Sequence, residues 1–178
     1  MGCGWRFRRH APGIRKFTLP IQRVEIRALR AQDRDDFIAA AGRLSAESLY
    51  RRFFSAKQGF SEKERSFFVD VDFANHVALI AVLDEGGTPV VVGGGRYVIV
   101  KPGQAEVAFA VVDEYQGQGL GAALVRHLVA IARNAGLSEL TAEVLPHNAA
   151  MLKAFEKSGL TVRTKRKSGT VHVTLQLT

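Results

Sequence analysis

The chain has 178 residues, of which 47% are hydrophobic and 24% charged, and these values fit one globular domain. The sequence has no run of about 18 apolar residues, so we expect no membrane-spanning helix. The single cysteine, Cys3, excludes an internal disulfide and a multi-thiolate metal site. It fits a reducing compartment, and we expect a cytoplasmic protein.

Positive charge is concentrated at the start of the chain. The formal net charge is +8, and residues 1–30 contain eight Lys or Arg residues against one acidic residue. We therefore predict a basic, flexible tail over residues 1–20, followed by one domain over residues 21–178. The tail either has no specific function or contacts an acidic partner or nucleic acid. Because the domain itself is nearly neutral, nucleic acid is not its expected partner.

The first third of the domain is predicted to open with a strand and continue with helices. Alternating apolar residues suggest a strand at about residues 21–29. Asp33, Ser45 and Ser61 each have the character of a helix N-cap, and Glu64 adds the capping-box spacing after Ser61. We therefore expect three short helices in this region.

The middle of the chain has the pattern of strands. Apolar runs at residues 77–83, 90–100 and 105–112 are separated by turn sequences, which predicts an antiparallel meander. Three consecutive glycines, residues 93–95, lie inside the second run, with no helix and no Lys-Ser/Thr pair after them. A β-bulge or close backbone packing is expected there rather than a phosphate loop.

Helices and strands alternate in the last third. Apolar residues at steps of three and four from Leu120 predict an amphipathic helix that ends at Gly136. A strand at 140–145, a helix at 148–158 and a hairpin over 161–177 are expected to follow. The fold class is therefore mixed α/β, with an antiparallel middle and a later strand–helix–strand crossover.

The junction before the long helix is rich in glycine, with Gly117, Gly119 and Gly121. The first turn of a helix presents unpaired N–H groups and the positive end of its dipole, and glycines let a phosphate approach the backbone. These residues predict an anion site at 116–122. A P-loop or Rossmann fingerprint does not fit the spacing, and a turn without ligand is the alternative on this segment alone.

The pattern Gln116-x-x-Gly119-x-Gly121 after a strand resembles the acyl-CoA pyrophosphate motif of the GNAT superfamily of N-acetyltransferases. The resemblance covers approximately residues 22–178, and residues 148–159 look like the second CoA-contacting helix of the family. It implies a GNAT fold: a mostly antiparallel central sheet with one splayed pair of parallel strands and flanking helices. It also implies acetyl-CoA as cosubstrate and no metal.

The resemblance further assigns contacts to acetyl-CoA. The pantetheine arm would lie between strands 105–112 and 139–145, and the backbone N–H groups of the motif would hold the pyrophosphate. Asn148 would contact the arm, and Phe155 would lie near the thioester sulfur. Because a Tyr in many family members is replaced by Phe155, we assign no general acid. The implied cofactor-binding residues are Phe109, Ala110, Val111, Gln116, Gly117, Gln118, Gly119, Leu120, Gly121, Ala122, Asn148 and Phe155.

A narrower resemblance lies in residues 44–54, LSAESLYRRFF, which look like a segment of bacterial Pat-type protein lysine acetyltransferases. This resemblance implies a protein acceptor similar to an acyl-CoA synthetase. The likeness suggests that Tyr50, Arg52 and Phe53 line the acceptor entrance. Helix packing with a surface arginine is the alternative interpretation.

Transfer of an acetyl group to lysine requires a neutral amine. The lysine pKa is about 10.4, so presenting the free amine near pH 7.4 costs about 4 kcal/mol, and a carboxylate can accept the proton. Glu106 is our candidate base, because it is the only acidic residue in 105–112 and aligns with the catalytic-glutamate strand of Pat-type enzymes. An exposed strand carboxylate is the alternative. His76 and His147 are expected to be structural or exposed.

Three functions are therefore compared. The first is acetyl-CoA-dependent acetylation of a protein lysine, and the second is the same chemistry on a small-molecule amine. The third is a CoA-binding regulatory module without catalysis, against which the presence of Glu106 argues. The expected partners are acetyl-CoA and the acceptor, with no membrane, and the chain is expected to be a monomer or a homodimer.

Overall fold

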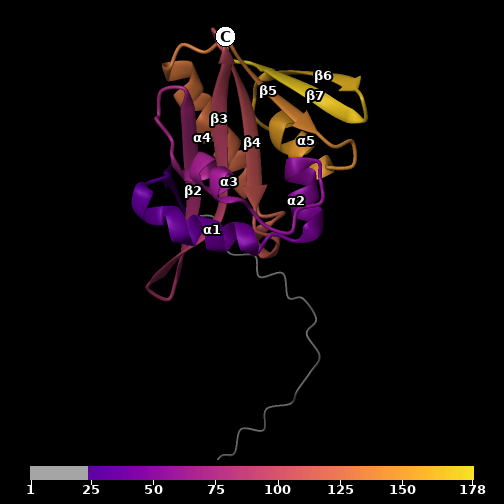
Figure 1. Cartoon of the computed structure of the whole chain (residues 1–178). Coiled ribbons are helices and arrows are strands. Elements are labelled where there is room, and N and C mark those ends of the chain that lie inside the picture. Colours follow the sequence, from indigo (N-terminus) through magenta and orange to yellow (C-terminus); the bar gives the residue numbers. More distant parts are fainter. Residues whose placement is uncertain (1–23) are drawn as a thin grey trace, which may run out of the picture.

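The computed structural model describes residues 24–178, so the predicted tail at residues 1–20 lies outside the described residues. A seven-stranded sheet in the order β1-β2-β3-β4-β5-β7-β6 forms the centre of the molecule. Helices α1, α2 and α3 lie on one side of it and α4 on the other (Figure 1). The strands are β1 (Val24–Ala28), β2 (His76–Glu85), β3 (Thr88–Lys101), β4 (Gln104–Val111), β5 (Glu139–Val144), β6 (Thr161–Lys167) and β7 (Thr170–Gln176).

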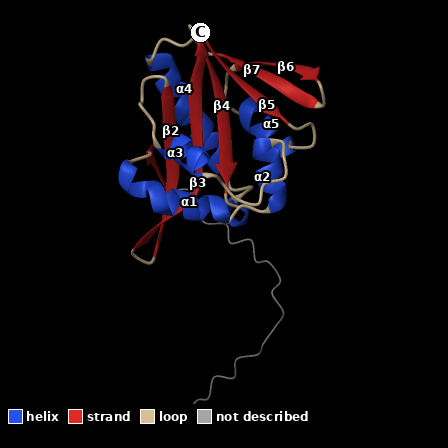
Figure 2. Cartoon of the chain, viewed as in Figure 1, coloured by secondary structure: helices blue, strands red, loops and turns tan. Residues whose placement is uncertain are grey.

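The helices agree closely with the order expected from the sequence. They are α1 (Arg34–Gly42), α2 (Ala46–Phe53), α3 (Glu62–Val69), α4 (Leu120–Asn134) and α5 (Ala149–Glu156), with 3-10 turns η2 (Ala31–Asp33) and η3 (Asp113–Tyr115). The alternation of helices and strands along the chain confirms the predicted α/β class (Figure 2). In residues 24–178 no helix is both long and apolar enough to span a bilayer.

Two of the three predicted helix caps are confirmed. The Ser45 hydroxyl accepts the backbone N–H of Ser48 at 3.1 Å, which starts α2. Ser61 and Glu64 form the expected capping box at the start of α3, with the Ser61 N–H donated to the Glu64 carboxylate at 2.9 Å. These side chains satisfy N–H groups that would otherwise lack partners in the first helical turn.

Asp33 occupies the N-cap position of α1, but its predicted capping role is wrong. Its carboxylate accepts hydrogen bonds from the two terminal guanidinium nitrogens of Arg27, at 2.6 and 2.7 Å, and from the backbone N–H of Arg30 at 2.8 Å. The hydrogen bond from Arg27 outweighs burial and holds the pKa of Asp33 below its ordinary value. The carboxylate therefore ties the entry of α1 to β1, because a charged partner competes well against a backbone amide.

Three glycines in β3 let other groups approach the strand closely, as predicted. The β2–β3 register shifts between Ala81 and Val82, opposite the start of this glycine run. A Cβ added to Gly95 would lie 2.5 Å from the ring of Phe109, and one added to Gly94 would lie 3.0 Å from the carbonyl oxygen of Leu79. The missing side chain of Gly95 therefore makes room for the Phe109 ring on the α4 side, where Leu128 is the next neighbour.

Replacing Gly95 by alanine is expected to destabilise the fold by about 1–3 kcal/mol, because overpacking a tight site forces neighbouring groups to move. Urea denaturation measures the change in the free energy of unfolding. Gly42→Ala is the matched control, because an added Cβ there has no neighbour within 4 Å. Equal stability of the two variants would contradict this account of the glycine run.

Phenylalanine rings pack the three helices on the other side of the sheet. Phe68 of α3 lies 6.3 Å from Phe37 of α1 and 5.9 Å from Phe53 of α2, measured between ring centroids. Phe60, in the loop before α3, contacts both Phe53 and Phe68 at 5.3 Å. This aromatic cluster fixes α2 beside β4, where it forms one wall of the site described next.

Candidate active site

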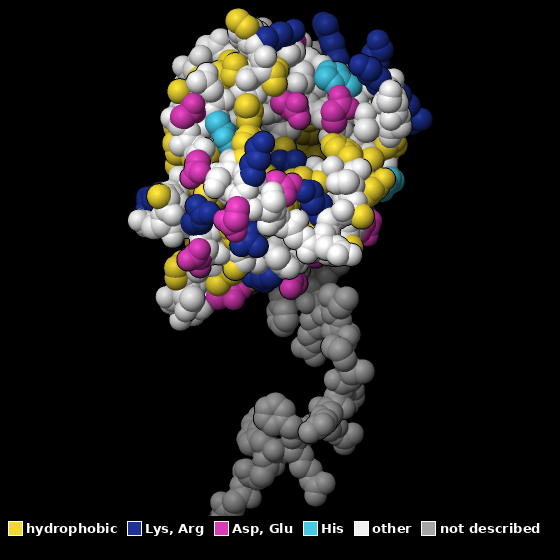
Figure 3. Space-filling model, viewed as in Figure 1, with side chains coloured by type: hydrophobic (Ala, Val, Ile, Leu, Met, Phe, Trp, Pro, Cys, Tyr) yellow, Lys and Arg dark blue, Asp and Glu magenta, His cyan; other side chains and the backbone are white. Residues whose placement is uncertain are grey.

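The sheet splits between β4 and β5. These parallel strands are paired only where Gln104–Glu106 face Glu139–Thr141, and no pairing continues beyond Glu106. A cavity of about 420 Å³ lies at the split, bounded by α2, the start of α4 and α5. Figure 3 shows a hollowed region on this face where hydrophobic and basic side chains gather. We call this space the main cavity.

The structure brings most of the predicted site residues together around the main cavity. The predicted residues that line it are Arg52, Glu106, Phe109, Ala110, Val111, Gln116, Gly117, Gly119, Leu120, Gly121, Ala122, Asn148 and Phe155. Three others do not line it. The Gln118 side chain donates back to the Glu114 carbonyl at 3.2 Å. Tyr50 is 45% exposed, and Phe53 lies in the aromatic cluster.

The N-terminus of α4 borders the main cavity without a side-chain cap. Its N-cap residue is Gly119, with φ of 88°, and no side chain of residues 24–178 caps the first turn. Gly117, with φ of 74°, has no atom within 4 Å of an added Cβ. Both φ angles lie in the region that favours glycine. Unpaired N–H groups and the helix dipole therefore face an open space that suits a diphosphate.

Basic side chains that the sequence reasoning did not assign also line the main cavity. Arg51, Lys153 and Lys157 are among them. The Arg51 Nε is buried and has no hydrogen-bond partner in the described part of the chain, although its guanidinium is ion-paired with Glu47. A buried donor without an acceptor is costly. The donors on these side chains fit the phosphates and amide carbonyls expected of acetyl-CoA. In the sequence, the adjacent residues Arg51 and Arg52 were the one feature that pointed to basic groups here.

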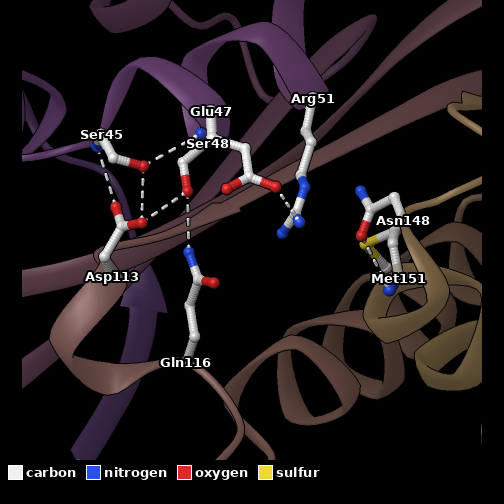
Figure 4. Close-up of polar contacts among 8 residues, drawn as sticks. All are labelled: Ser45, Glu47, Ser48, Arg51, Asp113, Gln116, Asn148 and Met151. Atoms are coloured by element: carbon white, nitrogen blue, oxygen red, sulfur yellow. Dashed lines mark hydrogen bonds and ion pairs between the residues drawn. The ribbon is translucent and has the colours of Figure 1, made fainter.

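The other end of the main cavity is apolar. Phe155 of α5 is 1% exposed, and its ring meets Phe109 nearly edge-to-face at 5.9 Å. Phe155 has no hydroxyl group, so it offers no general acid. Asn148 caps α5, since its side-chain oxygen accepts the N–H of Met151 at 3.3 Å (Figure 4). This leaves the side-chain amide nitrogen of Asn148 for contacts with a ligand.

A cluster of hydrogen bonds connects α2 to the loop before α4. The Asp113 carboxylate accepts the Ser45 N–H at 2.9 Å and the hydroxyls of Ser45 and Ser48 at 2.7 and 2.9 Å. The Gln116 amide donates to the Ser48 hydroxyl at 3.0 Å (Figure 4). It also donates to the Val111 carbonyl at 2.8 Å. We call this cluster the Asp113 clamp. It joins the wall of the main cavity to its glycine loop.

The negative charge of the Asp113 carboxylate stabilises the Asp113 clamp at neutral pH. Burial raises the pKa of Asp113, but the hydrogen bonds from Ser45 and Ser48 outweigh burial and hold this pKa below its ordinary value. A carboxyl whose pKa is lowered on folding stabilises the folded state above its unfolded pKa. The contribution is then lost as the pH falls through the folded value.

Replacing Asp113 by alanine is expected to lower kcat/KM for acetyl transfer about tenfold, because α2 loses its charge-assisted hydrogen bonds to the cofactor loop. Steady-state thiol release at pH 7.5 measures the effect. Asp84→Ala is the control, because this carboxylate caps a turn amide between β2 and β3 at 2.6 Å. The Asp113 clamp has no role in transfer if both variants retain wild-type kcat/KM.

Glu106 lies on β4 at the point where the two strands part, and its exposed side chain lines the main cavity. Arg52 of α2 stacks on Phe53, with its guanidinium carbon 4.8 Å from the ring centre. Burial lowers the pKa of Arg52 to about 10, while the Glu106 charge acts in the opposite direction. Glu106 and Arg52 therefore lie on the same cavity, close enough for their charges to interact.

The two histidines considered as bases lie elsewhere. His76 is buried at the start of β2, where its Nε2 is 3.1 Å from a guanidinium nitrogen of Arg96 and its ring stacks on Phe67 at 4.8 Å. Burial and the Arg96 charge lower the pKa of His76, so its ring is neutral at pH 7. His147 is exposed, and neither ring lines the main cavity.

Comparison with known proteins decides the family. Residues 43–160 match the model of the Acetyltransferase (GNAT) family. The chain belongs to the GNAT family. The matched region contains the α2 wall, Glu106, the glycine loop and α5, so the whole main cavity lies within the shared GNAT unit.

The chain resembles two GNAT relatives over about two thirds of its length. It is 35% identical over 118 residues to an acetyltransferase of Pseudomonas aeruginosa, covering 66% of this chain and 63% of that protein. It is 36% identical over 119 residues to Acetyltransferase Pat of Mycolicibacterium smegmatis, covering 65% of this chain and 34% of that protein. The match therefore spans less than two thirds of either relative.

A solved structure confirms the GNAT fold. The GNAT domain of S. lividans PAT superposes with a TM-score of 0.77 at 32% identity, covering 86% of this chain and 90% of that one. The predicted mostly antiparallel sheet with one parallel, splayed pair of strands is therefore correct. The residues 44–54, which suggested Pat-type enzymes, form α2 and its N-cap in this structure.

Proposed function

We propose that this GNAT protein transfers the acetyl group of acetyl-CoA to a lysine side chain of a protein, with Glu106 as general base. One observation carries the proposal. Glu106 lies where β4 and β5 part, on the same cavity that the uncapped N-terminus of α4 borders. A diphosphate at that N-terminus would leave the pantetheine arm to run along the split toward Glu106.

The reaction follows from this arrangement. The Glu106 carboxylate accepts a proton from the protonated acceptor amine, directly or through water, and the neutral nitrogen attacks the thioester carbonyl carbon. The new C–N bond forms, the C–S bond breaks, and CoA leaves as a thiolate. The nitrogen then loses its second surplus proton to this thiolate or to water, which gives the neutral amide. A thiol has a pKa of about 8.5, so this leaving group needs little help from an acid. The absence of a tyrosine at Phe155 is compatible with this chemistry.

Two features support a protein as acceptor. The relative with 36% identity is named Acetyltransferase Pat, and the solved structure with 32% identity is the GNAT domain of a PAT protein. The α2 segment that resembles Pat-type enzymes forms the wall beside Glu106. We therefore place the acceptor entrance along α2, and an acyl-CoA synthetase is the first substrate to test.

Thiol release from acetyl-CoA separates the alternatives. We expect release with an acyl-CoA synthetase and a new acetyl-lysine in that protein, detected by mass spectrometry. The protein assignment is wrong if release occurs only with polyamines, amino acids or aminoglycosides. Tight binding of acetyl-CoA without release to any acceptor would instead indicate a regulatory CoA-binding module.

A further inference from the structure

A second, smaller cavity of about 60 Å³ lies on the α1–α3 side of the sheet. Arg52 and Arg96 both line it, and the rest of its lining is apolar and includes four phenylalanine side chains. It shares Leu44, Arg52, Ala108 and Ala110 with the main cavity, so the two spaces adjoin along β4. A single water needs about 10–15 Å³, so a carboxyl group fits here.

Arg96 is a buried cation without a counter-charge. Its residue is 7% exposed, and no carboxylate in residues 24–178 lies within salt-bridge distance of it. Its hydrogen bond goes to neutral His76, and its guanidinium carbon lies 5.0 Å from the Phe68 ring and 5.6 Å from the Phe37 ring. Cation–π contacts offset part of the burial, but buried charges are normally paired.

Arg96 lies on the same face of the sheet as Glu106. In the β3–β4 register Arg96 is opposite Ala108, and Val98 is opposite Glu106. Directly opposed residues share a face, so Arg96 and Glu106 are diagonal neighbours, typically about 7–8 Å apart at their backbones. Arg52 closes the space from α2 and lines both cavities.

Arg52, Arg96 and Glu106 therefore form a cluster of two guanidinium groups and one carboxylate. Arg52 has no ion-pair partner among the described side chains either, and its charge, after burial, helps to lower the pKa of Arg96 to about 9. The two cations repel each other where water is largely excluded. An acceptor that brings an amine to Glu106 and an anion to the arginines would give the two guanidinium groups a shared counter-charge in addition to Glu106.

We propose that Arg96 and Arg52 form a carboxylate-binding subsite that selects acceptors with an acidic group close to the amine to be acetylated. The inference rests on the proposed function, since Glu106 must receive the amine. On a protein, the carboxylate belongs to an Asp or Glu next to the target lysine. On a small molecule, it is the free carboxylate of an amino acid.

Paired acceptors test the subsite. Thiol release is measured with lysine peptides that carry Asp or the isosteric Asn beside the lysine, and with free lysine against lysine amide. We expect kcat/KM to be about tenfold to a hundredfold higher for the carboxylate member, the scale of a charge-assisted hydrogen bond. A preference seen only in the peptide pair shows that the subsite recognises a side-chain carboxylate of a protein. A preference seen only in the lysine pair shows that it recognises the free carboxylate of an amino acid.

Arg96→Met separates recognition from folding. Replacing an uncompensated buried charge by an apolar side chain is often neutral or stabilising, so the Tm should not fall. The Asp-over-Asn preference should disappear, mainly through KM. Arg65→Met, at an arginine that lines neither cavity, should retain it. Equal rates within both acceptor pairs with the wild type overturn the subsite, whereas no release with any amine overturns the proposed function instead.

Discussion

Glu106→Gln is expected to lower the rate of acetyl transfer by about 10²–10⁴-fold, the usual contribution of a general base. The substitution keeps the shape of the side chain and removes its ability to accept a proton from the amine. The exposed position of Glu106 on β4 means that no buried hydrogen bond is lost. Acetyl-CoA affinity should remain within about twofold, because the expected diphosphate contacts lie at the other end of the main cavity.

Steady-state thiol release measures the rate, and isothermal titration calorimetry measures the Kd for acetyl-CoA. Glu156→Gln is a suitable control, because this exposed carboxylate of α5 does not line the main cavity. Wild-type turnover in Glu106→Gln would remove Glu106 from the role of base. An equal loss in both variants would point to general charge effects on the acceptor.

Gly119→Ala is expected to weaken acetyl-CoA binding at least tenfold. Gly119 has φ of 88° at the N-cap of α4, a conformation that costs other residues about 1–2 kcal/mol. Relief of this strain would turn the first N–H groups of the helix away from the main cavity. Binding of acetylpantetheine, which lacks the diphosphate, should be unchanged, because the loss concerns phosphate contacts alone.

Gly136→Ala is the matched control at the other end of the same helix. Gly136 has φ of 75°, and an added Cβ has no neighbour within 4 Å. The two variants should lose similar stability in urea denaturation, whereas acetyl-CoA affinity should fall only in Gly119→Ala. The phosphate assignment fails if both retain wild-type affinity, or if acetylpantetheine binding falls in parallel.

Local rules predicted the elements of this fold well. Ser45 and Ser61 cap their helices because hydroxyl groups satisfy the first N–H groups wherever the chain places them. Gly136 and Gly159 follow α4 and α5 with φ of 75° and 77°. These features depend on a few neighbouring residues, so periodicity and residue type were enough to find them.

Partners distant in sequence were not predictable in the same way. Asp33 has the right character for a cap, but Arg27 approaches from β1 and binds its carboxylate instead. Asp113 was not singled out, because its hydroxyl partners lie 65–68 positions earlier in the chain. The competition between a local amide and a distant charged donor is decided only when the chain has folded.

The sequence by itself determined the glycine loop, its helix and the strand that carries Glu106, since backbone geometry and hydropathy encode them locally. Only the tertiary structure decided that, within residues 24–178, the Nε of Arg51 has no partner at the main cavity and Arg96 is buried without a carboxylate beside it. Charge compensation and burial depend on which elements pack together in three dimensions. No local sequence pattern predicts whether an arginine side chain will lie in solvent, beside an acidic residue or beside a substrate.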